Sequence, residues 1–101
     1  MSTVVEIVIF DVKKGKEVEF EEGSKTFADF VATQEGYVRR WYFREKLFPG
    51  RYIHCTEYKD RDSGQDIIGN YKKVIGVEKF NYFFNLLKRM PKIEWHEIWL
   101  P

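Results

Sequence analysis

The segments of this chain that alternate like strands carry large apolar residues on both of their faces. In the last ten residues, "KIEWHEIWLP", Ile93, Trp95 and Trp99 fall on one face, while Ile98 and Leu100 fall on the other. A half-buried strand in a small domain is apolar on one face only. The sequence therefore requires a fold in which something covers both faces of the sheet.

Periodicity and turn residues indicate six elements. Strand patterns occur at residues 3–12, 36–45, 51–58 and 92–101, and helical spacing occurs at 15–34 and from Ser63 to just before Pro91. Ser63 followed by Asp66 resembles a capping box that starts the second helical region, and Gly76 is expected to break it. The order β-α-β-β-α-β predicts a ferredoxin-like α+β fold, an antiparallel sheet with its helices on one face.

The second face of this sheet needs a cover that the helices cannot supply. On the first strand, Val5, Ile7 and Ile9 share one face, and the residues that alternate with them on the other face are mainly apolar as well. On the second strand we expect Tyr37, Trp41 and Phe43 to share a face opposite Val38 and Tyr42. The simplest cover is the sheet face of a second copy, so the pattern predicts a homodimer.

Length, composition and charge limit the number of domains and the kinds of partner that we expect. A length of 101 residues predicts a single domain over residues 1–101, and 18% aromatic residues suggest an interface or a pocket besides the core. A net charge of +1 gives no sign of a nucleic-acid or membrane partner. With a lone Cys55, no signal peptide and no apolar span, we expect a cytoplasmic protein.

The stretch "EGYVRRWYFREKLFPGRYIHCTEYKDRDSG" resembles the antibiotic-biosynthesis-monooxygenase-like branch of the dimeric α/β barrel superfamily. Gly36 opens the second strand, "PGRYIHCTEY" follows a short turn, and Tyr58 precedes the polar entry to the second helical region. Gly15 and Lys16 after the first strand also fit. The resemblance covers almost the whole chain. It implies homodimers packed through their sheet faces, with a ligand pocket between the helices and the sheet of each subunit.

The resemblance further implies an activity that uses no cofactor. Enzymes of this kind need neither metal nor flavin, because an electron-rich substrate anion itself reduces oxygen. The chain departs from the family pattern at Thr56, where a Glu is common, and in "QDIIGNY", which lacks a common His. Haem-degrading members have an Asn on the first strand, which this chain lacks, so haem degradation is not expected.

Four residues are candidates for polar roles in a pocket: His54, His96, Asp11 and Arg39. His54 could be a general base with a pKa near neutrality, or a hydrogen-bonded histidine at the dimer interface. His96 shares a face with Glu94, which could orient it, or it is a surface or interface histidine. Asp11 could activate a substrate hydroxyl, or accept hydrogen bonds from the next turn.

Two further patterns have simpler structural explanations. Cys55 is expected to fill space beneath the helices, facing away from its basic neighbour. "RRWYFREK" interleaves cations with rings as an RNA-recognition module does, but "RYIHCTEY" lacks the glycines that such a module has on its third strand.

The leading hypothesis is a cofactor-independent monooxygenase that acts on a hydrophobic aromatic compound. The alternative is a non-catalytic, dimeric ligand-binding or stress-associated domain of the same superfamily, and an RNA-binding module is the remote third. No bound cofactor or metal is expected, because no cluster of His, Cys and carboxylate ligands is visible in the sequence.

Overall fold

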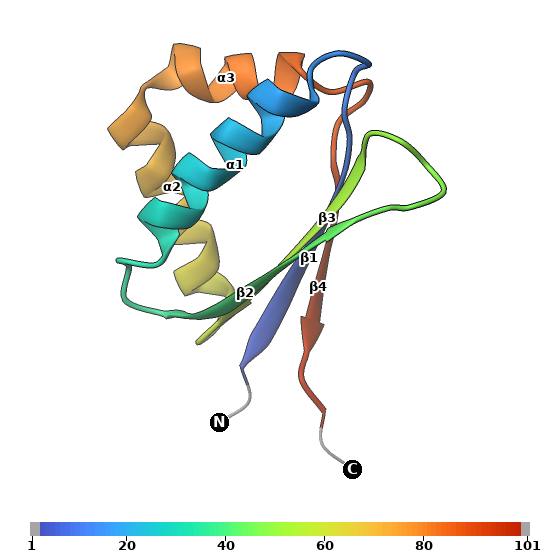
Figure 1. The fold of residues 1–101 in the computed structure, drawn as a ribbon. Helices are drawn as coiled ribbons and strands as arrows, with labels where there is room; N and C mark the ends of the chain where they lie inside the picture. The colour runs from blue at the N-terminus through green and yellow to red at the C-terminus, as the bar shows by residue number, and fades with distance from the viewer. Residues whose placement is uncertain (1–2, 100–101) are drawn as a thin grey trace.

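A computed structural model describes residues 3–99 of the chain. Three helices cover one face of a four-stranded antiparallel sheet (Figure 1), so the ferredoxin-like α+β prediction is confirmed. The elements are β1 (Val4–Asp11), α1 (Glu17–Val31), β2 (Tyr37–Arg44), β3 (Arg51–Tyr58), α2 (Arg61–Ile75), α3 (Val77–Asn85) and β4 (Lys92–Glu97). The strand order is β2-β3-β1-β4. Within residues 3–99, no helix is long and apolar enough to cross a bilayer.

The start of α2 differs from the prediction. The carboxylate of Asp60 accepts a hydrogen bond from the backbone N–H of Ser63 at 2.7 Å, so Asp60 is the N-cap and α2 begins at Arg61. The expected capping box at Ser63 is therefore wrong. Ser63 lies at the third helical position, where its backbone N–H is one of those that need a cap.

Gly76 divides the second helical region into α2 and α3, as predicted. Its φ is 91°, a conformation that glycine adopts without steric cost. The backbone N–H of Gly76 still bonds to the Lys72 carbonyl, after which the chain changes direction and α3 runs toward the end of β1 (Figure 1).

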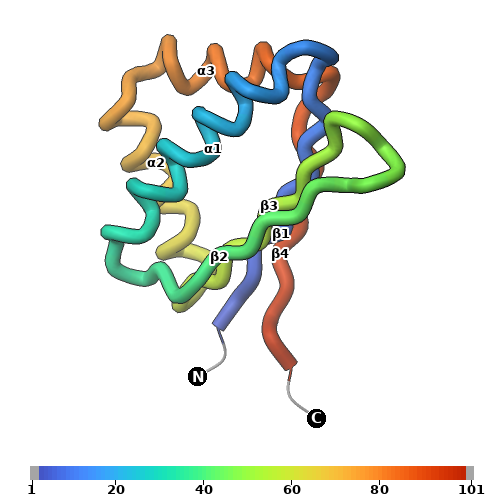
Figure 2. Tube along the Cα trace, viewed as in Figure 1, coloured from blue at the N-terminus to red at the C-terminus, as the bar shows by residue number. Residues whose placement is uncertain are grey.

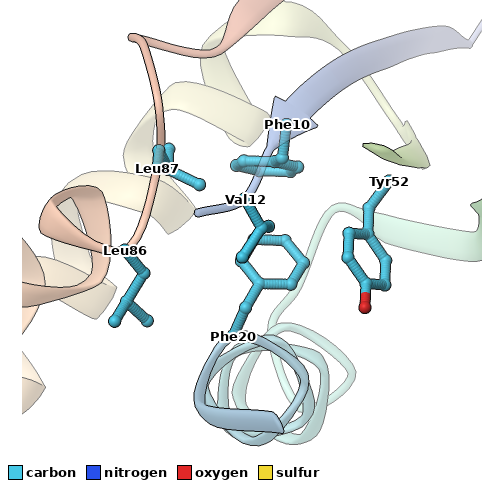
Figure 3. Close-up of a cluster of buried hydrophobic side chains, with 6 residues drawn as sticks. All are labelled: Phe10, Val12, Phe20, Tyr52, Leu86 and Leu87. Carbon is cyan, nitrogen blue, oxygen red and sulfur yellow. The ribbon is translucent and has the colours of Figure 1, made fainter. Parts of the chain in front are cut away.

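Two apolar clusters join the helices to the sheet. The larger one consists of Phe10, Val12, Phe20, Tyr52, Leu86 and Leu87, and Figure 3 shows Phe20 reaching from α1 toward the strand residues. The smaller one consists of Val31, Tyr58 and Ile67, with Trp95 packed against it. The clusters lie toward opposite ends of the sheet, and the space between them is only partly filled.

A β-bulge near the start of β2 changes which residues share a face. Tyr37 pairs with Tyr58, but Arg39 pairs with Glu57, so Val38 is the extra residue. Tyr37 therefore packs under the helices with the smaller cluster, whereas Trp41 lies on the opposite face. The prediction that Tyr37, Trp41 and Phe43 share a face is wrong because the alternation is interrupted.

The last strand is shorter than predicted. Trp95 is in register with Glu6 and packs against Tyr58 on the helix side, with ring centroids 5.9 Å apart. Trp99 follows the end of β4 and is 79% exposed, so the two tryptophans do not share an environment. The predicted strand residues Leu100 and Pro101 lie outside the described part of the chain.

The sheet face without helices, called the open face below, carries an apolar centre. Strand register places Val5, Ile7, Ile9, Trp41, Phe43, Ile53 and Cys55 there. Cys55 is thus not beneath the helices, and that expectation is wrong. The β1 and β3 residues of the open face pair with one another, so this apolar centre crosses two adjacent strands and continues into β2.

Candidate functional site

A cavity of ≈ 660 Å³ lies between the three helices and the sheet. Its walls are mainly aromatic and aliphatic side chains, with rings from α1, α2 and α3 that include Phe27, Tyr71 and Phe80. The sheet contributes the charged or polar side chains of Glu6, Arg40 and His54. This volume is typical of small-molecule sites, which place a few polar groups in an apolar enclosure.

Glu6 is a buried carboxyl group in the sheet wall of the cavity. The alternation of β1 points it toward the helices between Val4 and Val8, and its exposed fraction is 5%. Burial raises the pKa of Glu6 to about 7, against a smaller lowering by the positive charge of Arg40. A carboxylate with this pKa can accept a proton from a bound ligand near neutral pH.

Arg40 places a fixed guanidinium group beside this carboxyl. Its Nη1 donates to Thr56 Oγ1 at 2.5 Å, and its Nη2 donates to His54 Nδ1 at 3.1 Å. The guanidinium also lies over the rings of Phe27, at 4.8 Å, and Tyr42, at 5.1 Å. Arg40 thus supplies a positive charge to the cavity in a defined position, where it favours an anionic ligand.

His54 is hydrogen-bonded and neutral. Burial and, to a smaller extent, the charge of Arg40 lower the pKa of His54 to about 3. Because a guanidinium can only donate, Nδ1 is the acceptor and the proton of the neutral ring is on Nε2. The pKa of His54 therefore lies well below the near-neutral value that suits a general base, and the residue lies under the helices rather than on the open face.

A second cavity of ≈ 470 Å³ lies on the other side of His54, between α1 and strands β2 and β3. His54 and Ser24 line both cavities, so they belong to the wall that the two share. The His54 ring is held there by Phe10, with centroids 4.9 Å apart, and by Tyr42, at 5.0 Å. Packing on both sides fixes the orientation of the imidazole.

Two other sequence-based candidates form ion pairs outside the main cavity. The Asp11 carboxylate accepts a hydrogen bond from Arg51 Nε at 2.8 Å and another from Arg89. These bonds lower the pKa of Asp11, so it stays ionised and bound. Arg39 lies on the open face, 2.7 Å from Glu57 and over the Trp41 ring at 4.5 Å.

His96 also lies on the open face, in register with Val5. Its Nε2 is 2.9 Å from Glu94 Oε1, so the pairing suggested by the sequence forms, but on an exposed surface. Of the four candidates, the structure places only His54 in the main cavity. Among residues 3–99, no cluster of three His, Cys or carboxylate side chains is arranged to hold a metal ion.

Glu6 is not among the four sequence-based candidates, although the sequence contains a signal for it. Glu6 is the one charged residue on the face of β1 that carries Val4, Val8 and Phe10. A carboxyl group in the middle of an apolar strand face is costly to bury, and such groups gather at functional sites. Arg40 could be found through its pairing with Thr56 across the β2–β3 hairpin, which the two strand patterns imply.

Comparison with known proteins identifies the fold. No family model and no curated protein matches the chain. A conserved protein from Methanosarcina mazei Go1 has a similar structure, with a TM-score of 0.82, 20% identity, and coverage of 95% of this chain and 92% of that one. A putative antibiotic biosynthesis monooxygenase from Nitrosomonas europaea has a TM-score of 0.81 at 18% identity, covering 98% and 92%.

A third similar structure is a mutant form of SnoaB, a cofactor-independent oxygenase from Streptomyces nogalater. Its TM-score is 0.78 at 20% identity, and the alignment covers 95% of this chain and 92% of that one. The chain therefore has the fold of antibiotic-biosynthesis-monooxygenase-like proteins, which confirms the fold that the sequence resemblance implied.

Proposed function

We propose that the protein is a cofactor-independent monooxygenase whose substrate is a hydrophobic aromatic compound with a weakly acidic proton. The observation that carries this proposal is the buried Glu6 carboxyl, which faces an aromatic cavity with a pKa of about 7. The shared fold with SnoaB, described as a cofactor-independent oxygenase, supports the same class of reaction.

Each of the three polar residues in the sheet wall of the cavity has a role in this reaction. Glu6 takes the acidic proton, and the electron pair stays on the substrate as a delocalised anion. Arg40 stabilises that anion through its fixed positive charge. Neutral His54 is a positioning residue, which holds the Arg40 guanidinium through Nδ1. The rings of the helices orient the flat body of the substrate.

The reaction balances without an external reductant. The substrate anion transfers electrons to dioxygen, and a carbon–oxygen bond forms to give a hydroperoxide after protonation. Loss of water then breaks the oxygen–oxygen bond and leaves a carbonyl group on the former C–H carbon. One oxygen atom enters the product, the other leaves as water, and the substrate carbon supplies both electron pairs.

Oxygen uptake with 1,4-dihydroxynaphthalene and anthrone, in the presence of a chelator, tests the proposal. Wild-type protein should raise the rate above the spontaneous oxidation, and Glu6→Gln should lower the enzymatic part by roughly 10²–10⁴-fold. Glu35→Gln, a change of the same chemistry in an exposed loop, is the control. Binding of these compounds without any oxygen uptake would instead favour the non-catalytic, ligand-binding alternative.

We also propose that two copies form a homodimer through their open faces. The apolar centre of this face spans three strands and includes Phe43, which is 54% exposed in the single chain. Burying such a surface against a copy of itself is favourable in proportion to the apolar area removed from water. This assembly leaves both main cavities on the outer, helix-covered sides of the dimer.

A further inference from the structure

One end of the molecule combines most of the cations of the chain with exposed apolar side chains. Residues 13–16, 44–51 and 88–92 make up this surface, which we call the basic end. They hold nine of the 17 lysine and arginine residues but a single carboxylate, Glu45. The overall net charge of +1 conceals this local excess, because nearly all of the acidic residues lie in other segments.

Backbone hydrogen bonds bring the three segments of the basic end together (Figure 2). The N–H of Val12 donates to the carbonyl of Gly50 at 2.8 Å, and the N–H of Lys88 donates to the carbonyl of Asp11 at 2.7 Å. Gly50 has a φ of 87°, and a Cβ there would lie 2.8 Å from the Val12 carbonyl oxygen. The hairpin tip is thus fixed against the end of β1.

Part of the charge of the basic end remains available for a partner. Asp11 binds Arg51 and Arg89, which neutralises one of these two cations. Four exposed lysines of the basic end form no ion pair with any residue in 3–99: Lys13, Lys14, Lys46 and Lys88. A ligand surface of opposite charge would meet these ammonium groups without first having to separate them from carboxylates.

The same surface carries large apolar side chains that are mostly exposed. Leu47 is 80% exposed and Phe48 is 58% exposed at the hairpin tip, and Met90 is 74% exposed in the neighbouring loop. Apolar tips surrounded by lysines are characteristic of peripheral proteins, where the apolar groups enter the boundary of headgroups and acyl chains and the cations meet anionic lipids.

We propose that the basic end docks reversibly on the surface of a bilayer that contains anionic lipids. Lys13, Lys14 and Lys46 meet the lipid phosphates, while Leu47 and Phe48 insert at the headgroup boundary. A bilayer surface satisfies both features at once, whereas a nucleic acid offers no apolar phase to Leu47. Because the attraction is mainly electrostatic, it weakens as salt shortens the screening length. The proposal is independent of the chemistry in the cavity.

Sedimentation with vesicles tests the docking. The full chain is mixed with vesicles of pure phosphatidylcholine, or of phosphatidylcholine with 30 mol % phosphatidylglycerol. We expect binding to the anionic vesicles at 0.1 M salt, little binding at 0.5 M salt, and little to phosphatidylcholine at either. Lys13→Glu/Lys14→Glu/Lys46→Glu should lower the partition coefficient by at least about tenfold, given the contribution of each cation near an anionic surface.

Two comparisons separate local docking from general charge attraction. Lys25→Glu/Lys59→Glu/Lys73→Glu makes the same change in net charge at exposed positions of α1, of the loop before α2, and of α2, so it should retain most of the binding. Leu47→Ser/Phe48→Ser tests the apolar contribution and should weaken binding severalfold at constant charge. Circular dichroism verifies that each variant is folded.

Three results would overturn the docking proposal. The first is absence of wild-type binding to the anionic vesicles at 0.1 M salt. The second is an equal loss of binding in both triple-lysine variants, which would mean a nonspecific charge effect. The third is tighter binding to single-stranded poly(U) than to vesicles, with no effect of Leu47→Ser/Phe48→Ser, which would assign the basic end to nucleic acid.

Discussion

Glu6 is the residue whose protonation should most strongly link stability to pH. Its pKa is raised from 4.5 to about 7 on folding, so the folded state holds the proton more tightly than the unfolded state. The contribution of Glu6 to the free energy of unfolding is fully present below pH 4.5. It is lost as the pH rises through 7, since ionising the buried carboxyl is costly. The full effect is about 3 kcal/mol at 1.36 kcal/mol per pKa unit.

Glu6→Gln should therefore stabilise the protein at pH 8 and change it little at pH 4.5. Urea denaturation of wild type and variant at both pH values measures the difference, and Glu35→Gln corrects for general charge effects. A difference between Glu6→Gln and wild type that does not change with pH would show that the carboxyl is not desolvated as described.

His54 should stay neutral across the physiological range, because burial and Arg40 hold its pKa at about 3. In the His96→Gln variant it is the only imidazole, so its ring ¹⁵N signals can be followed by NMR without ambiguity. We expect a constant neutral, Nε2-protonated pattern between pH 5 and 8. A titration midpoint between pH 6 and 7 would restore the general-base role suggested by the sequence.

At the level of single residues, sequence reasoning located the site only in part. Alternation correctly separates Arg39 from Arg40, but it does not say which face the helices cover. The bulge at Val38 interrupts the alternation from which the face could be assigned, because it places Tyr37 and Trp41 on opposite faces of the sheet. His54 is distinctive by its residue type alone, whereas Glu6 is distinguished only by the apolar residues that share its face of β1.

Two glycines of the second helical region should respond oppositely to alanine. Gly76 needs a positive φ, so Gly76→Ala should destabilise the fold by about 1–3 kcal/mol through backbone strain alone, since no atom lies within 4 Å of the added Cβ. Gly69 is exposed inside α2 with equally open surroundings, so Gly69→Ala should stabilise it by roughly 0.5–1 kcal/mol. Chemical denaturation compares the two, and a similar effect of both would contradict the strain assigned to Gly76.

Element order and the helix break were predictable because they follow from periodicity and from glycine placement. The exact ends of the helices were less predictable. Ser63 carries a typical capping side chain, but Asp60, three positions earlier, also can cap, and the extended backbone at Asp60 lets its carboxylate reach the Ser63 N–H. Two residues with capping ability three positions apart leave the choice to tertiary packing, in which Gly64 fits tightly against Trp95 and Tyr58.

At the scale of the whole molecule, the proposed homodimer is the main consequence of the apolar open face. We expect sedimentation equilibrium at micromolar concentration to give a dimer and the melting temperature to rise with protein concentration. Ile7→Lys, at the centre of the open face, should favour the monomer or abolish folding, whereas Val18→Lys, at a 70% exposed site on α1, should not. A folded wild-type monomer with a concentration-independent melting temperature would exclude the dimer.

The position of β1 in the sheet also affects how the chain can fold during synthesis. β1 leaves the ribosome before the other three strands, yet its two neighbours are β3 and β4, and residues 92–97 form the last strand of the sheet. Until β4 arrives, β1 has an open edge, and the cavity lacks the wall that Ile93 provides. We therefore expect a nascent chain that ends before β4 to need chaperones, or to postpone folding until β4 is synthesised. The reason is that β1 is made early but gains its second neighbouring strand only at the end.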